Sequence, residues 1–384
     1  MQNDMNLDEL AAEMRVWRQD IHQHPEIGFN EHRTSAKVAN LLRSWGIEVH
    51  TGLGGTGVVG TIHGKFGPGL TIGLRADMDA LPMQEKTNLP YSSTNSGVFH
   101  GCGHDGHTSI LLGVSKYLAQ WRGFRGTVQL IFQPAEEVLR GGPSMIADGL
   151  FEKFPCDEIY ALHNNNKIPL GKIGVRAGTL LAACAMFRIT IKGIGSHAAM
   201  PDKSIDPIVA GAALVQALQT IVSRNIDPLA SGVVSICKFH AGEVLNVIPD
   251  TAVLEGTARA LGLELQEKIF ARMREICAGV AKAYDCDVNF EILQSGPPTI
   301  NAEGPTETVR LAAERVVGAE NVINNAMQVM AAEDFAFMLQ CRPGSYFYLG
   351  HDGLTCHHPE FDFDDNTLPT GAAVFIEIIR ERLA

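Results

Sequence analysis

The stretch LTIGLRADMD, residues 70–79, is an apolar run that ends in two acidic residues. Short apolar runs bounded by turn residues predict buried β-strands. Similar runs occur at GVVGTIHG (57–64), TVQLIFQP (127–134) and EIYALH (158–163), and the helical pattern SILLGVSKYLAQWR (109–122) lies between the runs at 70–79 and 127–134. Strands that alternate with helices predict an α/β fold.

A second pattern of strands and helices begins after residue 182. In chain order it comprises the strand AMFRITIKG, the helix IDPIVAGAALVQALQTIVSR, the strands GVVSICKF and TAVLEGTARA, the helix ELQEKIFARMREICAGVAKAY and the strand DVNFEIL. This block has apolar helix faces of its own and can bury its own core. We therefore predict two domains, one formed by residues 1–182 and 294–384, and an inserted α+β domain of residues 183–293.

Composition excludes several classes of partner. The chain has 31 basic and 43 acidic residues, a net charge of −12, and no basic run, which argues against nucleic acids and anionic membranes and favours a small-molecule substrate. Its eight cysteines are scattered without a CxxC pair, as is typical of reduced thiols in the cytosol. Helical periodicity covers residues 6–22 and 31–45, and the charged first helix lacks the apolar core of a signal peptide. These features predict a cytoplasmic protein.

Polar side chains follow three of the predicted strands of the first domain. Asp77 and Asp79 end the run at 70–79, Glu136 and Glu137 follow the run at 127–134, and His163 ends the run at 158–163. In open α/β sheets, ligands bind beyond the carboxyl ends of the strands. We therefore expect these side chains to converge in one site.

The decapeptide FHGCGHDGHT (99–108) brings further metal-binding side chains to this site. Cys102 and His104 are two residues apart, so both side chains of an extended segment point the same way. Thiolate, imidazole and carboxylate together suit a divalent transition metal. Taken alone, the segment is better explained without a metal, with Cys102 as a small buried residue and the histidines at the start of a helix. The convergence of several such elements favours the metal site.

Two further stretches bear on this site. Neighbouring extended residues point in opposite directions, so one carboxylate of Glu136–Glu137 can bind metal while the other holds a water. In TCHHPEFDFDD, His357 or His358 is the last candidate ligand. The glycine-rich GLGGTGVVG (52–60) leads into a strand rather than a helix, which predicts a hairpin or turn and not a nucleotide-binding loop.

The order of these motifs resembles the peptidase M20 family, in its amidohydrolase branch of hippurate hydrolases and N-acyl-amino-acid amidohydrolases. The resemblance spans nearly the whole chain and begins at HQHPEIGFNE (22–31). The motifs that carry it are RADMDALP, CGHDGHT, QPAEE, His163, GSHAAMP around His197, NVIPD from Asn246, AAEDF around Glu333 and HHPEF from His357.

The resemblance implies a catalytic domain of residues 1–182 and 294–384 that holds two divalent metal ions, either Mn, Zn, Co or Ni, and a lid or dimerisation domain of residues 183–293. Glu136 matches the general base, and Asp79 matches the aspartate that orients a ligand. Asp77 stands where other branches have a metal-binding histidine, so its role stays open. The residues that match the metal ligands are Cys102, His104, Glu137, His163 and His357.

Three residues of the inserted domain are candidates for the active site. The resemblance implies that His197 stabilises the oxyanion, whereas without the motif it would be a surface histidine. Arg259 lies on a predicted strand, where it can pair with the carboxylate of the amino-acid half of the substrate or form a surface ion pair, and Asn246 of the motif NVIPD is a further predicted substrate-binding residue. His197 can act only if the lid closes over its own site or if a partner chain supplies it. We expect a homodimer or dimer-based oligomer, because the strand AMFRITIKG and the helix after it suit a dimer surface.

The predicted function is metal-dependent hydrolysis of the amide bond of hippurate-like N-acyl amino acids, which releases a carboxylic acid and a free amino acid. Within the class, the alternatives are a dipeptidase and an N-acetyl-amino-acid deacetylase. An enzyme with Cys102 as nucleophile and His104 or His107 as base would form an acyl intermediate and resist chelators. A non-catalytic binding module would be expected to have lost Glu136 or a ligand.

Overall fold

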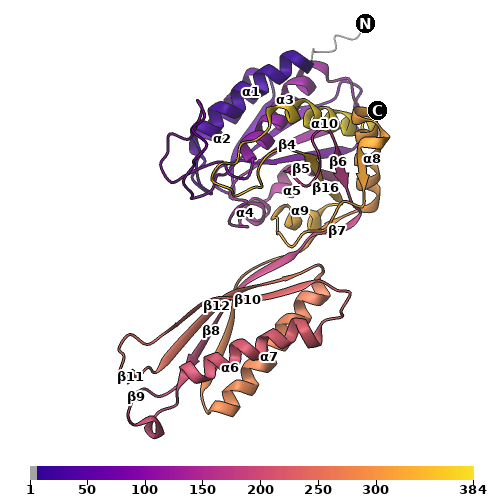
Figure 1. Cartoon of the computed structure of the whole chain (residues 1–384). Coiled ribbons are helices and arrows are strands. Elements are labelled where there is room, and N and C mark those ends of the chain that lie inside the picture. The colour runs from indigo at the N-terminus through magenta and orange to yellow at the C-terminus, as the bar shows by residue number, and fades with distance from the viewer. Residues whose placement is uncertain (1–6) are drawn as a thin grey trace. The chain divides into compact units, whose positions relative to one another are not determined.

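The apolar run at 70–79 forms β3 (Thr71–Asp77), an inner strand of an eight-stranded sheet in the computed structural model, which describes residues 7–384 (Figure 1). In spatial order the strands are β1 (Glu48–Leu53), β2 (Gly57–His63), β4 (Thr127–Gln133), β3, β5 (Glu158–Asn165), β16 (Gly344–Gly350), β6 (Ile173–Val175) and β15 (Val322–Asn324). β3 runs parallel to β4 and β5, and β16 runs parallel to β5. β1 and β2 form an antiparallel hairpin, which confirms the prediction for residues 52–60.

Helices cover this sheet. Along the chain they are α1 (Leu7–Gln23), α2 (His32–Ser44), α3 (His104–Trp121), α4 (Gly141–Ala147), α5 (Leu150–Lys153), α8 (Glu303–Val317), α9 (Phe335–Cys341) and α10 (Leu368–Arg382). α1, α3 and α10 pack against one another on one side, and α4 packs against α9 on the other (Figure 1). Residue 6 of the first predicted helix lies outside the described residues. No helix within residues 7–384 is long and apolar enough to cross a membrane.

The burial of β3 explains its continuous apolar sequence. Six of its seven residues are buried, because helices cover the sheet and neighbouring strands flank it. Side chains of α1, α3 and α10 complete a single hydrophobic core with this strand. The predicted α/β fold is therefore confirmed.

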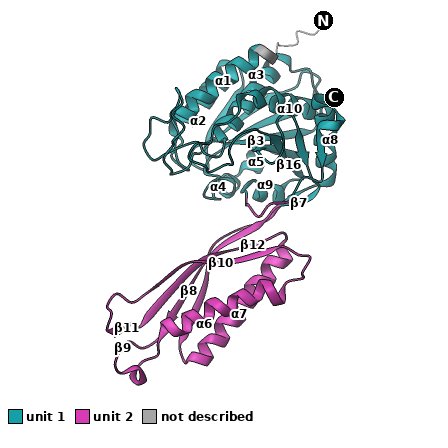
Figure 2. Ribbon diagram, in the orientation of Figure 1, with its two compact units in different colours: residues 1–180, 300–327, 333–384 teal, residues 181–299, 328–332 magenta. Residues whose placement is uncertain are grey.

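The chain divides into two compact units (Figure 2). Unit 1 contains the residues up to Leu180 together with Ile300–Met327 and Glu333–Ala384, and unit 2 contains Leu181–Thr299 and Gln328–Ala332. Unit 2 includes all of the predicted insertion 183–293, extends past both of its ends, and adds residues 328–332, which the strand and helix pattern does not mark. Two short strands, β7 (Gly178–Leu181) and β14 (Thr299–Asn301), pair with each other where the chain passes between the units.

Unit 2 has its own sheet and its own core. Its antiparallel sheet has the order β10 (Gly232–Ala241), β12 (Thr251–Ala260), β8 (Ala183–Lys192) and β13 (Asp287–Gly296), and a small separate sheet pairs β9 (Ser196–His197) with β11 (Val247–Ile248). Helices α6 (Pro207–Thr220) and α7 (Leu263–Tyr284) pack on the four-stranded sheet. Burial alternates along β12, so one face of the sheet packs on the helices and the other does not.

The strand AMFRITIKG, which the sequence predicts to suit a dimer surface, is an interior strand of the unit 2 sheet. β8 lies between β12 and β13, and its backbone is paired on both sides, so it cannot extend the sheet into a second chain. A strand paired on both sides has no free hydrogen-bonding groups to offer another chain. The edge strands of this sheet are β10 and β13.

Candidate metal centre

The predicted ligands come together at the carboxyl ends of the parallel strands. β3, β4 and β5 end at one edge of the sheet, with Asp77 directly beside Gln133 in the register. Potential ligand atoms of Cys102, His104 and His163 lie within 4.8 Å of one another. The same holds for Cys102, Glu137 and His357, and for His104, Glu136 and Glu137. The five predicted ligands and Glu136 therefore form one cluster.

The segment before α3 turns sharply to place Cys102 and His104. Gly103 has a φ of 95°, and an added Cβ there would lie 2.4 Å from the Asn164 Oδ1 atom. Only glycine accepts both this left-handed backbone and this close approach. The turn starts α3 at His104, five residues before the helical pattern predicted for 109–122.

Two imidazole rings are oriented so that the same nitrogen faces the cluster. The Nδ1 atom of His104 lies 2.9 Å from the Asp79 carbonyl oxygen, and the Nδ1 atom of His163 lies 2.7 Å from the Asn164 carbonyl oxygen. A carbonyl oxygen only accepts, so each Nδ1 donates, and in the neutral ring Nε2 keeps its lone pair. The Nε2 atom of His163 lies 3.5 Å from the Cys102 Sγ atom.

The residues fit a divalent transition metal. The buried Nε2 atom of His104 forms no hydrogen bond within the described part of the chain, and its nearest carboxylate oxygens, on Asp77, Glu136 and Glu137, are 3.7, 3.8 and 4.0 Å away. A buried polar atom without a partner is costly unless something binds it. A set of thiolate, imidazole and carboxylate donors suits Zn²⁺ and its first-row neighbours.

Asp79 connects His104 to the loop that carries Glu136 and Glu137. Its carboxylate accepts hydrogen bonds from the backbone N–H groups of Glu136 and Glu137, each at 3.0 Å, and lies 3.3 Å from the Nδ1 atom of His104. One buried side chain therefore fixes both the histidine ring and the loop that carries the two glutamates. This position agrees with the orienting role that the resemblance implied.

Glu136 is buried among acidic neighbours. Burial and the negative charges of Glu333 and Glu137 raise the pKa of Glu136 well above its usual range. A carboxylate with a raised pKa accepts a proton more readily than an exposed one. This property suits a residue that must take and return a proton.

Asp77 lies at the centre of a buried polar network. Its carboxylate binds the Nη1 atom of Arg75 and lies within hydrogen-bonding distance of the Nδ1 atom of His107, both at 2.7 Å. Burial opposes ionisation, yet the neighbouring His104, Arg75 and His107 side chains hold the pKa of Asp77 well below its usual range. Both oxygens of Asp77 are therefore engaged by residues behind the cluster.

Sequence reasoning gave no role to several residues of this network. Arg75 also donates to the Glu333 carboxylate at 2.8 Å, and the Tyr346 hydroxyl donates to the same carboxylate at 3.0 Å. The Nε2 atom of His107 lies 2.7 Å from the Asn164 Oδ1 atom. An arginine inside an otherwise apolar strand was the available signal, because a buried charge requires partners.

Unit 2 brings two of its three predicted residues together. His197 pairs with Val247 across β9 and β11, and the Ala198 N–H donates to the Asn246 carbonyl oxygen at 3.0 Å. The Ala199 N–H donates to the Nδ1 atom of His197 at 3.0 Å, so the neutral ring carries its proton on Nε2. Both His197 and Asn246 are exposed.

Arg259 lies at the other end of the unit 2 sheet. It pairs with Cys184 and Val233, whereas the opposite end of β12, at Thr251, adjoins the segment that carries Asn246. Its Nη1 atom donates to the Met330 carbonyl oxygen at 2.9 Å. The structure therefore does not bring Arg259 together with His197 within unit 2.

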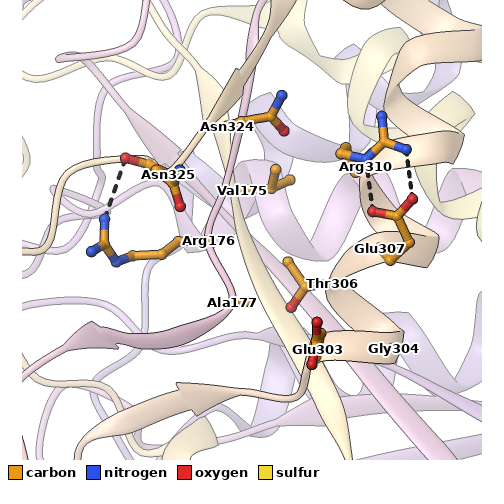
Figure 3. Close-up of a pocket in the computed structure, with 10 residues that line it drawn as sticks. All are labelled: Val175, Arg176, Ala177, Glu303, Gly304, Thr306, Glu307, Arg310, Asn324 and Asn325. Carbon is orange, nitrogen blue, oxygen red and sulfur yellow. Dashed lines mark hydrogen bonds and ion pairs between the residues drawn. The ribbon is translucent and has the colours of Figure 1, made fainter.

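A separate hollow of about 550 Å³ lies in unit 1 beside β6, β15 and the start of α8 (Figure 3). Its two arginines are engaged within the chain. Arg310 binds Glu307 at 2.5 Å and also pairs with Glu314, while Arg176 donates to the carbonyl oxygens of Asn325 and Ala326. None of the predicted site residues lines this hollow.

Comparison with known proteins identifies the family. The model of peptidase family M20/M25/M40 matches residues 73–381. The chain is 40% identical over 374 residues to a hippurate hydrolase of Campylobacter jejuni, covering 96% of each chain, and 38% identical over 368 residues to an N-acetyl-L-cysteine deacetylase of Bacillus subtilis, covering 95% of this chain and 87% of that one.

A solved structure supports the same conclusion. Bacillus subtilis YXEP, described as a dinuclear metal binding peptidase from the M20 family, superposes with a TM-score of 0.86 at 33% identity, covering 98% of this chain and 99% of that one. The family match, the identities and the clustered ligands agree with one another. The chain belongs to peptidase family M20/M25/M40 and is a metal-dependent amidohydrolase.

Proposed function

We propose that this enzyme hydrolyses the amide bond of N-acyl amino acids, with hippurate-like compounds as the first candidates, through two divalent metal ions. The convergence of Cys102, His104, Glu137, His163 and His357 around Glu136 carries the proposal. The names of the two relatives above support it, because a hippurate hydrolase and an N-acetyl-L-cysteine deacetylase both cleave an acyl group from an amino acid.

The five ligand residues would hold two divalent ions through one sulfur atom, three imidazole nitrogens and one carboxylate. Bound there, the ions would supply electrophilic chemistry, which lowers the pKa of a water molecule and polarises the amide carbonyl group.

Glu136 moves the proton in this mechanism. Its carboxylate takes a proton from the attacking water as the water oxygen bonds to the carbonyl carbon, and then delivers that proton to the amide nitrogen as the carbon–nitrogen bond breaks. Asp79 keeps the carboxylate in place through the Glu136 N–H group and orients His104. The products are a carboxylic acid and a free amino acid.

The roles proposed for unit 2 concern the substrate. The Nε2–H group of His197 donates to the oxyanion that develops on the carbonyl oxygen. Arg259 pairs with the carboxylate of the amino-acid half of the substrate. Asn246, which lies next to the strand that pairs with His197, contributes a further substrate contact.

We infer that His197 acts in the site of a second copy of the chain. The ten residues of β12 span roughly 30 Å. The Thr251 end adjoins the segment that carries His197 and Asn246, while the Ala260 end adjoins Ala183 and the connections to unit 1. A group this far along an inserted unit is well placed to reach a partner. Exposed apolar side chains on α6 and β10, including Val209 and Phe239, support a dimer surface there.

Complementation between two inactive variants tests this arrangement. We expect Glu136→Ala and His197→Ala each to lose most activity, the latter by about 10²–10³-fold. After unfolding and refolding together at equal amounts, half of the dimers are mixed, and one of their two sites has both residues intact. Roughly a quarter of wild-type sites should therefore return. Absence of recovery despite demonstrated subunit exchange would contradict a shared site.

A substrate panel tests the proposed reaction. The metal-loaded enzyme is assayed on benzoyl-, acetyl-, indoleacetyl- and long-chain acyl amino acids and on unblocked dipeptides, each with Mn, Zn, Co and Ni. We expect hydrolysis of acyl amino acids with release of the free amino acid. Turnover of dipeptides alone would replace this proposal with a dipeptidase.

A cytoplasmic location completes the proposal. None of the eight cysteines, all of which lie within residues 7–384, forms a disulfide, and Cys237 and Cys341 are exposed. Such thiols persist in a reducing compartment.

A further inference from the structure

Three successive backbone N–H groups of the loop that carries Glu136 are bound by two buried carboxylates. Asp79 accepts from Glu136 and Glu137, as described above. The N–H group of the preceding residue, Ala135, donates to the Oε1 atom of Glu31 at 2.8 Å. The loop that holds the proposed base and a proposed ligand is therefore fixed from two separate segments of the chain.

The backbone of Ala135 needs such an anchor. Its φ angle is 52°, in the left-handed region that L-residues with a Cβ atom disfavour, and its side chain is fully buried. Alanine has no side-chain group of its own to hold this conformation. A contact from elsewhere must therefore stabilise it.

Glu31 is directed at this loop rather than at its own helix. It occupies the N-cap position of α2, yet its side chain forms no capping hydrogen bond. Glu26 caps the helix instead, because its two carboxylate oxygens accept hydrogen bonds from the N–H groups of Arg33 and Thr34, each at 2.9 Å. Glu31 is fully buried, and its second oxygen accepts from the Thr56 hydroxyl at 2.6 Å.

The segment around Glu31 is fitted closely to Ala135. A Cβ atom added to Gly28 would lie 3.0 Å from both the Cα and the Cβ atoms of Ala135, tighter than ordinary contact. The motif HQHPEIGFNE (22–31) therefore packs directly on the loop before Glu136.

We propose that Glu31 is a positioning residue, which holds Ala135 in its left-handed conformation and thereby sets the direction of the Glu136 carboxylate. This inference rests on the proposed role of Glu136 as the proton carrier. Glu31 acts through the backbone and does not touch the substrate.

A simpler role for Glu31 would be helix stabilisation alone. A negative charge at the N-terminus of α2 is favourable whatever its side chain contacts. Glu26 offers the matched control, because its carboxylate binds the N–H groups of Arg33 and Thr34 at the same helix terminus.

Kinetics separate the two roles. We expect Glu31→Ala to lower kcat by about 10–100-fold, because a small displacement of a reacting group has effects of this size, while KM and metal content stay near those of wild type. Glycine adopts positive φ without strain, so a chain with Ala135→Gly should depend less on Glu31. The kcat of the double variant Glu31→Ala/Ala135→Gly should therefore be close to that of Ala135→Gly alone. Glu31→Gln keeps the size but weakens the acceptor, and should show the same rescue after a loss of roughly three- to tenfold. Glu26→Ala should lower Tm with little effect on kcat.

Amide hydrogen exchange gives a readout that does not depend on activity. In the metal-free and the metal-loaded protein, the amides of residues 135–137 should exchange at least about tenfold faster in Glu31→Ala and stay unchanged in Glu26→Ala. In the double variant, the amides of residues 136 and 137, which keep Asp79 as their acceptor, should recover. Unchanged exchange at 135–137 in both Glu31 variants, or no rescue by Ala135→Gly, would overturn the inference. If wild type hydrolyses no acyl amino acid while the exchange pattern holds, the proposed function fails and the structural coupling stands.

Discussion

Glu136→Gln should lose about 10²–10⁴-fold in kcat while it keeps its metal and still binds substrate. The substitution preserves the shape of the side chain and removes its ability to carry a proton. The backbone N–H group of residue 136 still reaches the Asp79 carboxylate, so the loop should stay in place. Steady-state kinetics with metal analysis by mass spectrometry provide the measurement.

Glu137→Gln is the matched control, because it changes the neighbouring residue of the same loop in the same way. Its carboxylate groups with Cys102 and His357, and an amide is a weaker ligand than a carboxylate. We expect this variant to lose metal first and activity as a consequence, with partial recovery at high metal concentration. Equal metal loss in both variants would contradict the separate roles of the two glutamates.

Removal of the metal should abolish activity. A chelator should take the enzyme to background rates, and addition of Mn, Co, Ni or Zn should restore it, because the proposed ligand set suits such ions and the proposed reaction depends on them. Full activity in protein shown to be metal-free would refute the mechanism.

Cys102→Ser distinguishes a metal ligand from a nucleophile. Loss of even an outer partner of a metal ligand lowers metal affinity by about 10–100-fold, so loss of the Cys102 thiolate should cost at least that much. If the variant instead kept two metals per chain, and an acyl group could be trapped on Cys102 of the wild type, the nucleophile hypothesis would hold.

The convergence of the site was predictable because it follows from a rule of sheet topology. Polar residues that end or follow parallel strands meet at one edge, and Asp77, Glu136 and His163 do so. Periodicity also identified the four strands of the larger unit 2 sheet and the helices α6 and α7 within a few residues, because buried and exposed positions alternate along them, whereas the short strands β9 and β11 were not predicted. The order of residues along the chain was therefore sufficient to predict these features.

Contacts that depend on tertiary approach were not predictable. The left-handed backbone of Ala135 has no signature in the letters PAEE, and the partner of its N–H group lies 104 residues earlier in the chain. Similarly, the interior position of β8 depends on which strands flank it, and an apolar strand has the same pattern at an edge as in the middle. Such features can be identified only from the three-dimensional structure.

The position of β16 determines when the fold can be completed during protein synthesis. β16 lies between β5 and β6, although almost 180 residues separate it from β5 along the chain. The ribosome releases all of residues 181–299 before β16 exists, so most of unit 2 can fold while the larger sheet remains in two parts. Until residues 344–350 emerge, β5 has an unpaired edge, the kind of surface that joins to other chains. A nascent chain that stalls before residue 344 should therefore depend on chaperones to stay unaggregated.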